Sequence, residues 1–316
     1  MHRSPPAVAV LGGTGFIGRH VVRRLLDAGA AASTIQRGRT GAAAPGARSI
    51  AADRADVTAL RAALADAAPA VLVDMIAYTA EDAERLVRSL PASLERLVVI
   101  SSGDVYWSYG AFLGQEPSKL PSRPLGESAP LRATRYPYRA TASGREDMRY
   151  RYEKMDVEEI ARGRAPVPVT VLRLPMVYGP NDPQGRIAGS LARLRSGGGT
   201  VRVNAAESGW RCTRGYVEDV AAGIALATLD ARAVGATYNL GEPDALSERE
   251  WLETVAEAAG VACRVVPDHD VAPSLPAKWA IPLATDTRRI RSELGYREPV
   301  GRPEGVRRSL RSSMSP

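Results

Sequence analysis

Apolar and polar positions alternate in blocks along the first half of the chain. Short strand-forming runs, typical of buried parallel strands, occur at 7–11, 33–36, 70–76, 97–101 and 167–174. Between them, apolar residues recur with helical spacing at 16–28, 56–67, 80–90 and 150–162. Alternating strands and helices predict βαβ units. The expected fold class is therefore α/β, a Rossmann doubly wound parallel sheet.

The pattern changes after Pro175, where loop-forming residues become frequent. We expect a dinucleotide-binding Rossmann domain at 1–174 and a smaller, mainly substrate-binding lobe at 175–316. Residues 201–240 partly return to the Rossmann domain, because the pattern predicts a helix and a strand at 217–229 and 237–240. Residues 107–149 are rich in Pro, Gly, Ser and Arg. Loops this long are usually functional, which predicts a lid or substrate-binding insertion.

A glycine-rich turn follows the first predicted strand. A sharp turn, a close approach of backbone to a pyrophosphate, and close helix–strand packing each favour glycine. The next helix would also direct its first N–H groups and the positive end of its dipole at the phosphates. The strand–turn–helix context makes the pattern specific for dinucleotide binding. The predicted cofactor-binding residues here are Gly12, Gly13, Thr14, Gly15, Phe16, Ile17 and Gly18.

The second strand ends without the carboxylate that would bind a ribose 2′-hydroxyl and repel a 2′-phosphate. Gln36 stands there, followed by Arg37 and Arg39. Arginine can hold a phosphate through bidentate hydrogen bonds, so these residues favour NADP over NAD. The alternative is that both arginines point into solvent. Asp53 comes just after a third, shorter apolar run, which follows Arg39, and is placed to meet the adenine.

Candidate catalytic groups follow two later elements. Tyr150 and Lys154 are four residues apart on a predicted helix and would project from one face. An ammonium beside a phenol stabilises the phenolate and lowers the tyrosine pKa toward that of a general base. Ser101 and Ser102 end another strand, at the sheet edge where ligands of open α/β sheets bind. A serine there can hydrogen-bond a substrate carbonyl or hydroxyl.

Composition narrows the class further. The 42 Lys and Arg residues exceed the 35 Asp and Glu residues, which gives a net charge of +7. This sign suits anionic small molecules or nucleic acid, but the arginines are spread along the chain, as on a solvated surface. There is neither an apolar run of about 20 residues for a membrane span nor a signal-peptide pattern, so we expect a cytoplasmic protein. The two cysteines and three scattered histidines predict neither a disulfide framework nor a metal site.

Taken together, the residues resemble the extended short-chain dehydrogenase/reductase family, the group of nucleotide-sugar epimerases and dehydratases. The resemblance spans nearly the whole chain, and several motifs in order are more specific than any one alone. The motifs are Gly12–Gly18, Ser101-Ser102-x-x-Val105-Tyr106, Tyr150-x-x-x-Lys154-x-x-x-Glu158, Leu172–Pro180, Arg214-Gly215-Tyr216-Val217-x-Asp219-Val220 and Tyr238–Gly241.

The resemblance implies a shared mechanism. Tyr150 would act as general base or acid, while Lys154 would lower its pKa and hold the nicotinamide ribose. Ser102 would orient the reacting oxygen, and a hydride would pass to or from the nicotinamide ring. Asp104 stands where dehydratase and decarboxylase members carry a glutamate, so it is a candidate additional acid. Further implied contacts are Ala77 and Pro175 to the cofactor, Met176 to the substrate, and Arg214 to a substrate phosphate.

Three departures count against a UDP- or dTDP-sugar substrate. Met176 replaces the usual asparagine, Tyr150 lies unusually far (48 residues) after Ser102, and the acid of the second strand is missing. The expected function is an NAD(P)-dependent oxidoreductase or epimerase/dehydratase acting on a hydroxyl or keto carbon of a sugar-like or natural-product small molecule. One alternative is an NADPH-consuming ketoreductase. Another is a repurposed, non-catalytic Rossmann protein that binds RNA or another partner; chloroplast stem-loop RNA-binding proteins, which resemble this family, are an example. We expect no nucleic acid or membrane partner, and a homodimer, which is common among relatives.

Overall fold

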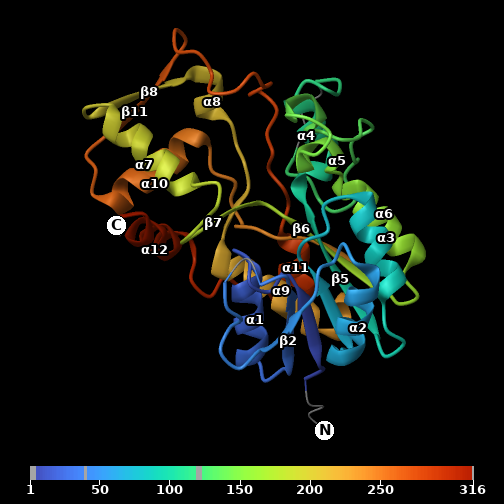
Figure 1. The fold of residues 1–316 in the computed structure, drawn as a ribbon. Coiled ribbons are helices and arrows are strands. Elements are labelled where there is room, and N and C mark those ends of the chain that lie inside the picture. Colours follow the sequence, from blue (N-terminus) through green and yellow to red (C-terminus); the bar gives the residue numbers. More distant parts are fainter. Residues whose placement is uncertain (1–4, 39–40, 119–122, 315–316) are drawn as a thin grey trace.

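The computed structural model describes residues 5–38, 41–118 and 123–314. Within these residues, the central element is a seven-stranded parallel sheet in the order β10-β6-β5-β4-β1-β2-β3 (Figure 1). Its strands are β1 (Val8–Leu11), β2 (Ala32–Gln36), β3 (Arg48–Ala51), β4 (Val71–Asp74), β5 (Arg96–Ser102), β6 (Val169–Leu174) and β10 (Thr237–Asn239). The chain starts at a central strand, moves to one edge, and then returns to build the other.

Helices cover both faces of this sheet, because its strands are apolar on both sides. Val8 and Val10 face one core cluster, and Ala9 and Leu11 face another. The first cluster is closed by α1 (Gly18–Asp27) and α9 (Val217–Leu229). The second is closed by α2 (Val57–Ala67), α3 (Ala80–Ser89) and α6 (Lys154–Arg164). The predicted doubly wound Rossmann fold is confirmed.

Local sequence explains where several helices begin. The Asp56 carboxylate accepts hydrogen bonds from two backbone N–H groups of the first turn of α2. A reciprocal capping box joins Thr79 to Asp82 at the start of α3, and another joins Ser247 to Glu250 at α10 (Glu248–Ala259). These side chains satisfy N–H groups that a helix start leaves without intrahelical partners.

A smaller C-terminal lobe lies beyond one end of the sheet (Figure 1). Its two-stranded parallel sheet packs with helices that contact one another. The chain reaches it through β7 (Met176–Tyr178), which pairs with β9 (Arg214–Tyr216). The remaining elements of this half are α7 (Arg186–Ser196), β8 (Thr200–Asn204), α8 (Ala205–Gly209), β11 (Arg264–Asp268), α11 (Arg288–Leu294), α12 (Arg302–Met314) and the short 3-10 helix Ala231–Ala233.

Two segments of the second half of the chain belong to the main sheet. β10 pairs with β6, and α9 packs against α1. The described residues between β5 and α6 are largely irregular, and the helices among them are short. These are Gly103–Val105 and Arg139–Thr141, both 3-10, with α4 (Trp107–Phe112) and α5 (Met148–Arg151). No helix in the described part of the chain is both long enough and apolar enough to span a membrane.

Candidate active site

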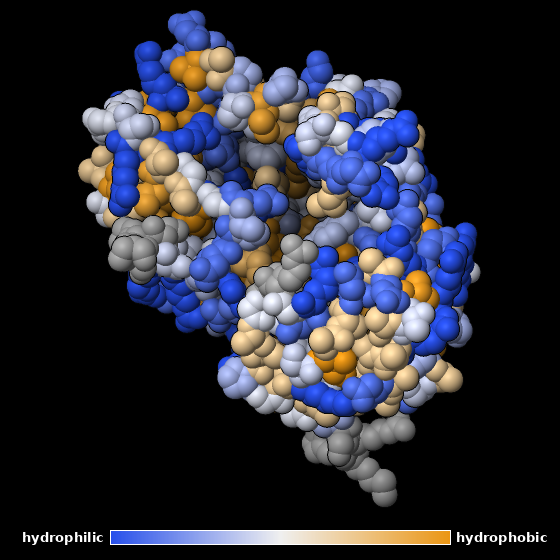
Figure 2. Space-filling view, in the orientation of Figure 1, coloured by the Kyte–Doolittle hydropathy of each residue, from blue (hydrophilic) through white to orange (hydrophobic). Residues whose placement is uncertain are grey.

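A cavity of about 620 Å³ lies between the carboxyl edge of the sheet and the C-terminal lobe. Figure 2 shows the molecule hollowed between these two parts. The wall of the cavity is formed by the glycine-rich turn after β1, the end of β5, the start of α6, and the loop that leads into the lobe. Pockets of this size at this edge of an α/β sheet are where ligands bind.

The glycine-rich turn has no room for side chains at Gly12, Gly13 and Gly18, and Gly12 also has a φ of +81°. A Cβ on Gly18 would overlap the carbonyl of Gly12, and one on Gly13 would lie 2.5 Å from Thr34 Oγ1. Gly15 differs, because its added Cβ would be 3.4 Å from the Gly12 oxygen and the residue lines the cavity. No side chain caps the N-terminus of α1, and Gly18, its first residue, lines the cavity. This arrangement fits a dinucleotide pyrophosphate.

The end of β2 carries the groups proposed to distinguish NADP from NAD. Gln36 accepts a hydrogen bond from Gly38 N at 3.1 Å and donates one to Ser49 at 3.2 Å. Arg37 Nη1 lies 3.9 Å from Asp53 Oδ2, and the two side chains are 54% and 47% exposed. The Arg37 side chain is thus half-exposed, and a 2′-phosphate would have to displace its acidic neighbour Asp53. Arg39 lies outside the described residues.

The two serines that end β5 have different partners. Ser101 Oγ donates a 2.5 Å hydrogen bond to Glu158, which is also held by a bidentate ion pair with Arg173. Ser102 Oγ accepts a hydrogen bond from Asp104 N at 3.2 Å and keeps its own proton to donate. Both serines line the cavity. Ser102 is therefore the serine whose hydroxyl proton is not bound by Glu158, and its hydroxyl lies within hydrogen-bonding reach of Tyr152.

Lys154 begins α6 and its side chain is buried at the cavity wall. Its ammonium donates to the carbonyl oxygens of Ala77 at 2.5 Å and Ile100 at 2.8 Å. The ammonium also lies 4.6 Å from the ring centre of Tyr78. Burial lowers the pKa of Lys154 to about 8, opposed by the negative charges of Asp74 and Asp104. Two of the three ammonium protons are bound, and one remains for a ligand.

The expectation that Tyr150 and Lys154 share one helix face is wrong. α5 ends at Arg151, and Tyr152 and Glu153 are extended before α6 begins at Lys154. Tyr150 is half-buried, and the Arg139 guanidinium carbon lies over it, 4.7 Å from the centre of the tyrosine ring. The described residues that line the cavity include Met148, Arg149 and Tyr152 but not Tyr150.

A buried ion pair causes this break. The side chains of Arg132 and Glu153 are both 0% exposed, and their Nη2 and Oε1 atoms are 2.9 Å apart. The Glu153 carboxylate also accepts hydrogen bonds from the backbone N–H groups of Tyr136 at 2.6 Å and Met155 at 3.0 Å. A buried carboxylate needs such partners, and Glu153 reaches them as the N-cap of α6 rather than as an interior helical residue.

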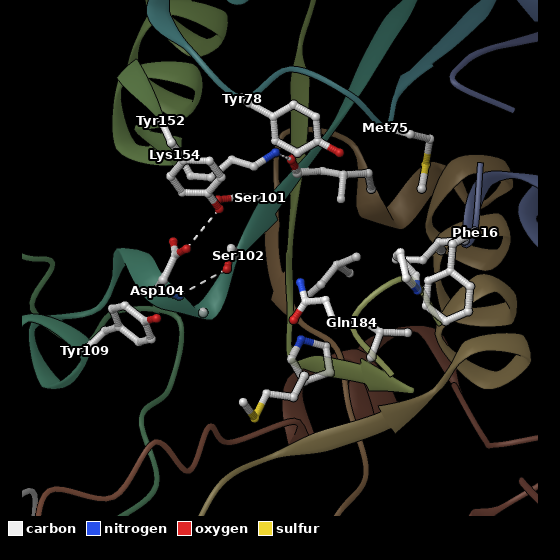
Figure 3. Close-up of a pocket in the computed structure, with 18 of the residues that line it drawn as sticks. Phe16, Met75, Tyr78, Ser101, Ser102, Asp104, Tyr109, Tyr152, Lys154 and Gln184 are labelled. Carbon is white, nitrogen blue, oxygen red and sulfur yellow. Dashed lines mark hydrogen bonds between the residues drawn. The ribbon is translucent and has the colours of Figure 1, made fainter. Parts of the chain in front are cut away.

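Tyrosines that the sequence did not single out surround Asp104. Asp104 Oδ2 accepts hydrogen bonds from Tyr138 Oη and Tyr152 Oη, both at 2.9 Å. Tyr138 Oη also bonds Tyr109 Oη at 2.9 Å. Figure 3 shows Tyr152, Asp104 and Ser102 facing the same space. Burial raises the pKa of Asp104, and the neighbouring Arg132 opposes this shift. No spacing in the sequence identifies these tyrosines, because the insertion brings them together only in the folded chain.

The predicted substrate-side residues have different environments. Pro175 and Met176 line the cavity. Arg214 is buried, and its Nη2 is 2.6 Å from Glu248 Oε2. Its guanidinium also lies 4.6 Å from the ring centre of Trp251. Glu248 therefore compensates the charge of Arg214 inside the protein. Arg214 is also absent from the described residues that line the cavity.

Comparison with known proteins identifies the family. The chain matches the model of the NAD dependent epimerase/dehydratase family over residues 8–241. It belongs to this family. The resemblance seen in the sequence is thereby confirmed, and the chain is an NAD(P)-dependent enzyme of the short-chain dehydrogenase/reductase type. No curated protein sequence matches it significantly.

Solved structures share the same architecture. The UDP-glucose 4-epimerase of Thermus thermophilus, in complex with NAD, is 25% identical, with 97% of this chain and 98% of that chain covered and a TM-score of 0.70. The enzyme WbmG of Bordetella bronchiseptica, with NAD and UDP, is 19% identical, with 98% and 95% covered and a TM-score of 0.70. The UDP-glucose 4-epimerase of Thermotoga maritima, with UDP-glucose, is 19% identical, with 96% and 97% covered and a TM-score of 0.69. The last two show the shared fold only.

Proposed function

We propose that this enzyme binds a nicotinamide dinucleotide in the cavity and acts on a hydroxyl-bearing or keto carbon of a sugar-like or natural-product substrate. The observation that carries this proposal is that one cavity joins the glycine-rich turn to Ser102 and Lys154. The bound nicotinamide ring supplies the hydride acceptor or donor. The glycine-rich turn holds the pyrophosphate, and the free ammonium proton of Lys154 is offered to the nicotinamide ribose. Ser102 donates its hydrogen bond to the reacting oxygen.

The substrate side favours a molecule without a nucleoside diphosphate. Met176 presents a thioether at the cavity wall, where nucleotide-sugar members have an amide. The cation that would hold a phosphate, Arg214, is paired with Glu248. Arg186, which does line the cavity, is ion-paired with Asp182 at 3.0 Å. A neutral sugar or polyketone-like ligand would leave these ion pairs intact, whereas a diphosphate would compete with two carboxylates.

The test is to purify the protein, denature it, and identify any released nucleotide by chromatography and absorbance. Tightly held, oxidised NAD or NADP supports an epimerase or dehydratase that returns its hydride to the same substrate. Protein that emerges empty but binds added NADPH supports the second candidate, a ketoreductase that consumes its cofactor. The missing carboxylate at Gln36 and the half-exposed Arg37 favour that candidate and NADP. Binding of neither cofactor would overturn the proposal.

Isomerase activity, a homodimer, a cytoplasmic location and the division into 1–174 and 175–316 stay predictions. The adenine contact assigned to Asp53 stays a prediction as well. Filter retention of RNA at low and high salt would test the repurposed-scaffold alternative, because phosphate contacts dominate nucleic-acid binding and make it salt-dependent.

A further inference from the structure

We propose that Tyr152, and not Tyr150, is the phenol that exchanges a proton with the substrate, and that Asp104 is its proton partner. This inference rests on the proposed function, since it concerns the same site. Tyr152 lies two positions after Tyr150. The sequence motif implies a continuous helix here, but the backbone at Tyr152 is extended.

Tyr150 and Tyr152 differ in their position relative to Lys154 and the cavity. In a continuous helix, residues four apart share a face, and residues two apart lie on nearly opposite sides. Tyr150 would then lie beside Lys154, and Tyr152 would point away. The extended backbone at Tyr152 and Glu153 reverses this arrangement. Tyr152 and Lys154 both line the cavity (Figure 3), and Tyr150 is covered by Arg139.

The second argument is that the break is built into the fold. Glu153 is anchored by Arg132 and by the backbone of Tyr136, both from the insertion. Its own backbone N–H donates to Tyr78 O at 2.9 Å, on the loop after β4. Restoring one continuous helix would withdraw the buried Glu153 carboxylate from Arg132 and from the backbone N–H of Tyr136. The buried contacts of Glu153 therefore keep the helix broken and place Tyr152, rather than Tyr150, at the cavity.

The third argument is the chemistry around the Tyr152 hydroxyl. Tyr152 Oη donates to Asp104 Oδ2 at 2.9 Å, and Ser102 lies within hydrogen-bonding reach of it as well. The second carboxylate oxygen, Asp104 Oδ1, is buried and has no hydrogen-bond partner in the described structure. A carboxylate with one oxygen bonded to two phenols, Tyr138 and Tyr152, and the other oxygen unpaired has the capacity to take up a proton.

The proton transfer balances. When a substrate alcohol is oxidised, its O–H bond breaks and the proton passes to the Tyr152 oxygen. The original Tyr152 O–H proton passes to Asp104, whose carboxylate becomes a neutral acid. The electron pair of the substrate C–H bond leaves as hydride to the oxidised cofactor, so the substrate loses one proton and one hydride and becomes a ketone. Reduction of a ketone runs through the same positions in reverse, with Tyr152 as the donor.

The experiment is a titration of tyrosines labelled with ¹³C at Cζ, followed by NMR without and with added NAD or NADP. The single variants Tyr152→Phe and Tyr150→Phe assign the two signals. We expect the cofactor to shift the Tyr152 signal and to lower its apparent pKa, because the cationic nicotinamide favours a nearby phenolate. The Tyr150 signal should not respond. A response of Tyr150 with none from Tyr152 would overturn the inference while leaving the proposed function standing.

Asp104 is tested in the same spectra. Asp104→Asn keeps the shape and an acceptor oxygen but removes the negative charge, so the apparent pKa of Tyr152 should fall relative to the unmodified protein. A residue with only a packing role would leave that titration unchanged, and this result would remove Asp104 from the proposal.

On any sugar or ketone that the protein turns over, Tyr152→Phe should lower kcat by roughly 10²- to 10⁴-fold. Tyr150→Phe is the matched control and should stay within a few-fold of the unmodified protein. Urea unfolding of both variants separates a loss of chemistry from a loss of folding. If neither cofactor binds in the titration, the proposed function itself fails, and the inference fails with it.

Discussion

The glycine-rich turn after β1 and the segment from the end of β5 to the start of α6 both line the cavity, but they were built in different ways. The turn is local: its seven consecutive residues carry both the motif and the geometry, and the expected strand–turn–helix is present. The second segment contains a motif that the tertiary structure overrides, since Tyr150 and Lys154 lie in different helices. The difference teaches that a spacing motif transfers only while the secondary structure beneath it is kept.

The largest expected effect concerns the ion pair that breaks the helix. Glu153→Ala leaves the Arg132 charge buried without its partner, which typically costs about 3–5 kcal/mol of folding stability. It also removes the N-cap of α6. Urea unfolding should show the loss, and hydrogen exchange should show lower protection around Tyr152. Glu159→Ala is a control, because that carboxylate is 60% exposed. Equal losses in the two variants would mean that Glu153 does not hold the segment in place.

The next effect tests the local character of the glycine-rich turn. Gly18→Ala places a methyl group against backbone atoms, with the Gly12 carbonyl carbon 3.0 Å away. Overpacking of this kind typically costs about 1–3 kcal/mol, which thermal unfolding would measure. Gly15→Ala has more room, so its stability should change little. Its cofactor affinity should nevertheless fall by roughly tenfold or more, about 1.4 kcal/mol, because the methyl group meets the pyrophosphate. If Gly15→Ala bound cofactor normally, the turn would not hold the pyrophosphate.

A smaller effect follows from the titration of Lys154. Burial lowers its pKa from 10.5 to about 8, so its positive charge, and with it one proton for the ribose, is lost as pH rises through about 8. A hydrogen bond from a charged group contributes about 1.5–3 kcal/mol, so cofactor affinity should weaken by roughly ten- to a hundredfold above that pH. Calorimetric titration against pH would measure this loss, and Lys154→Met should abolish the pH step.

The same pKa shift has the opposite effect on the stability of the cofactor-free protein. Between pH 8 and 10.5 the unfolded chain still holds the Lys154 proton, whereas the folded chain has released it. Stability therefore gains a contribution that rises with pH across this window. A cofactor affinity that stayed flat to pH 10 would show that the ammonium makes no contact with the ligand.

The smallest expected effect is at the end of β2. Arg37 is half-exposed and has Asp53 at 3.9 Å, and exposed charge contacts are weak. Arg37→Asp should shift the ratio of NADP to NAD affinity toward NAD by roughly tenfold, about 1.4 kcal/mol. Fluorescence titration with both reduced cofactors would measure the ratio. An unchanged ratio would mean that Arg37 points into solvent and that the preference for NADP has no support there.

Several family motifs serve the packing of the sheet rather than the chemistry. Glu158 joins α6 to β5 and β6 through Ser101 and Arg173. Tyr106 donates to Asn239 Oδ1 at 2.6 Å, linking the end of β5 to β10. A buried polar network of this kind is stable only when its members are satisfied. The matching motifs therefore predicted the fold correctly, although Tyr150 and Lys154 do not share one helix.

The sequence by itself determined what depends on neighbours along the chain. The apolar runs, the helix caps at Asp56 and Thr79, and the glycine-rich turn each need only a few consecutive residues. The family followed from the order of these motifs. Tertiary structure decided the rest, because a buried charge must find its partners wherever the chain supplies them. Arg132, in the insertion, pulls Glu153 out of the helix, and this places Tyr152 against Asp104. No spacing of residues along the chain predicts the contact between Tyr152 and Asp104.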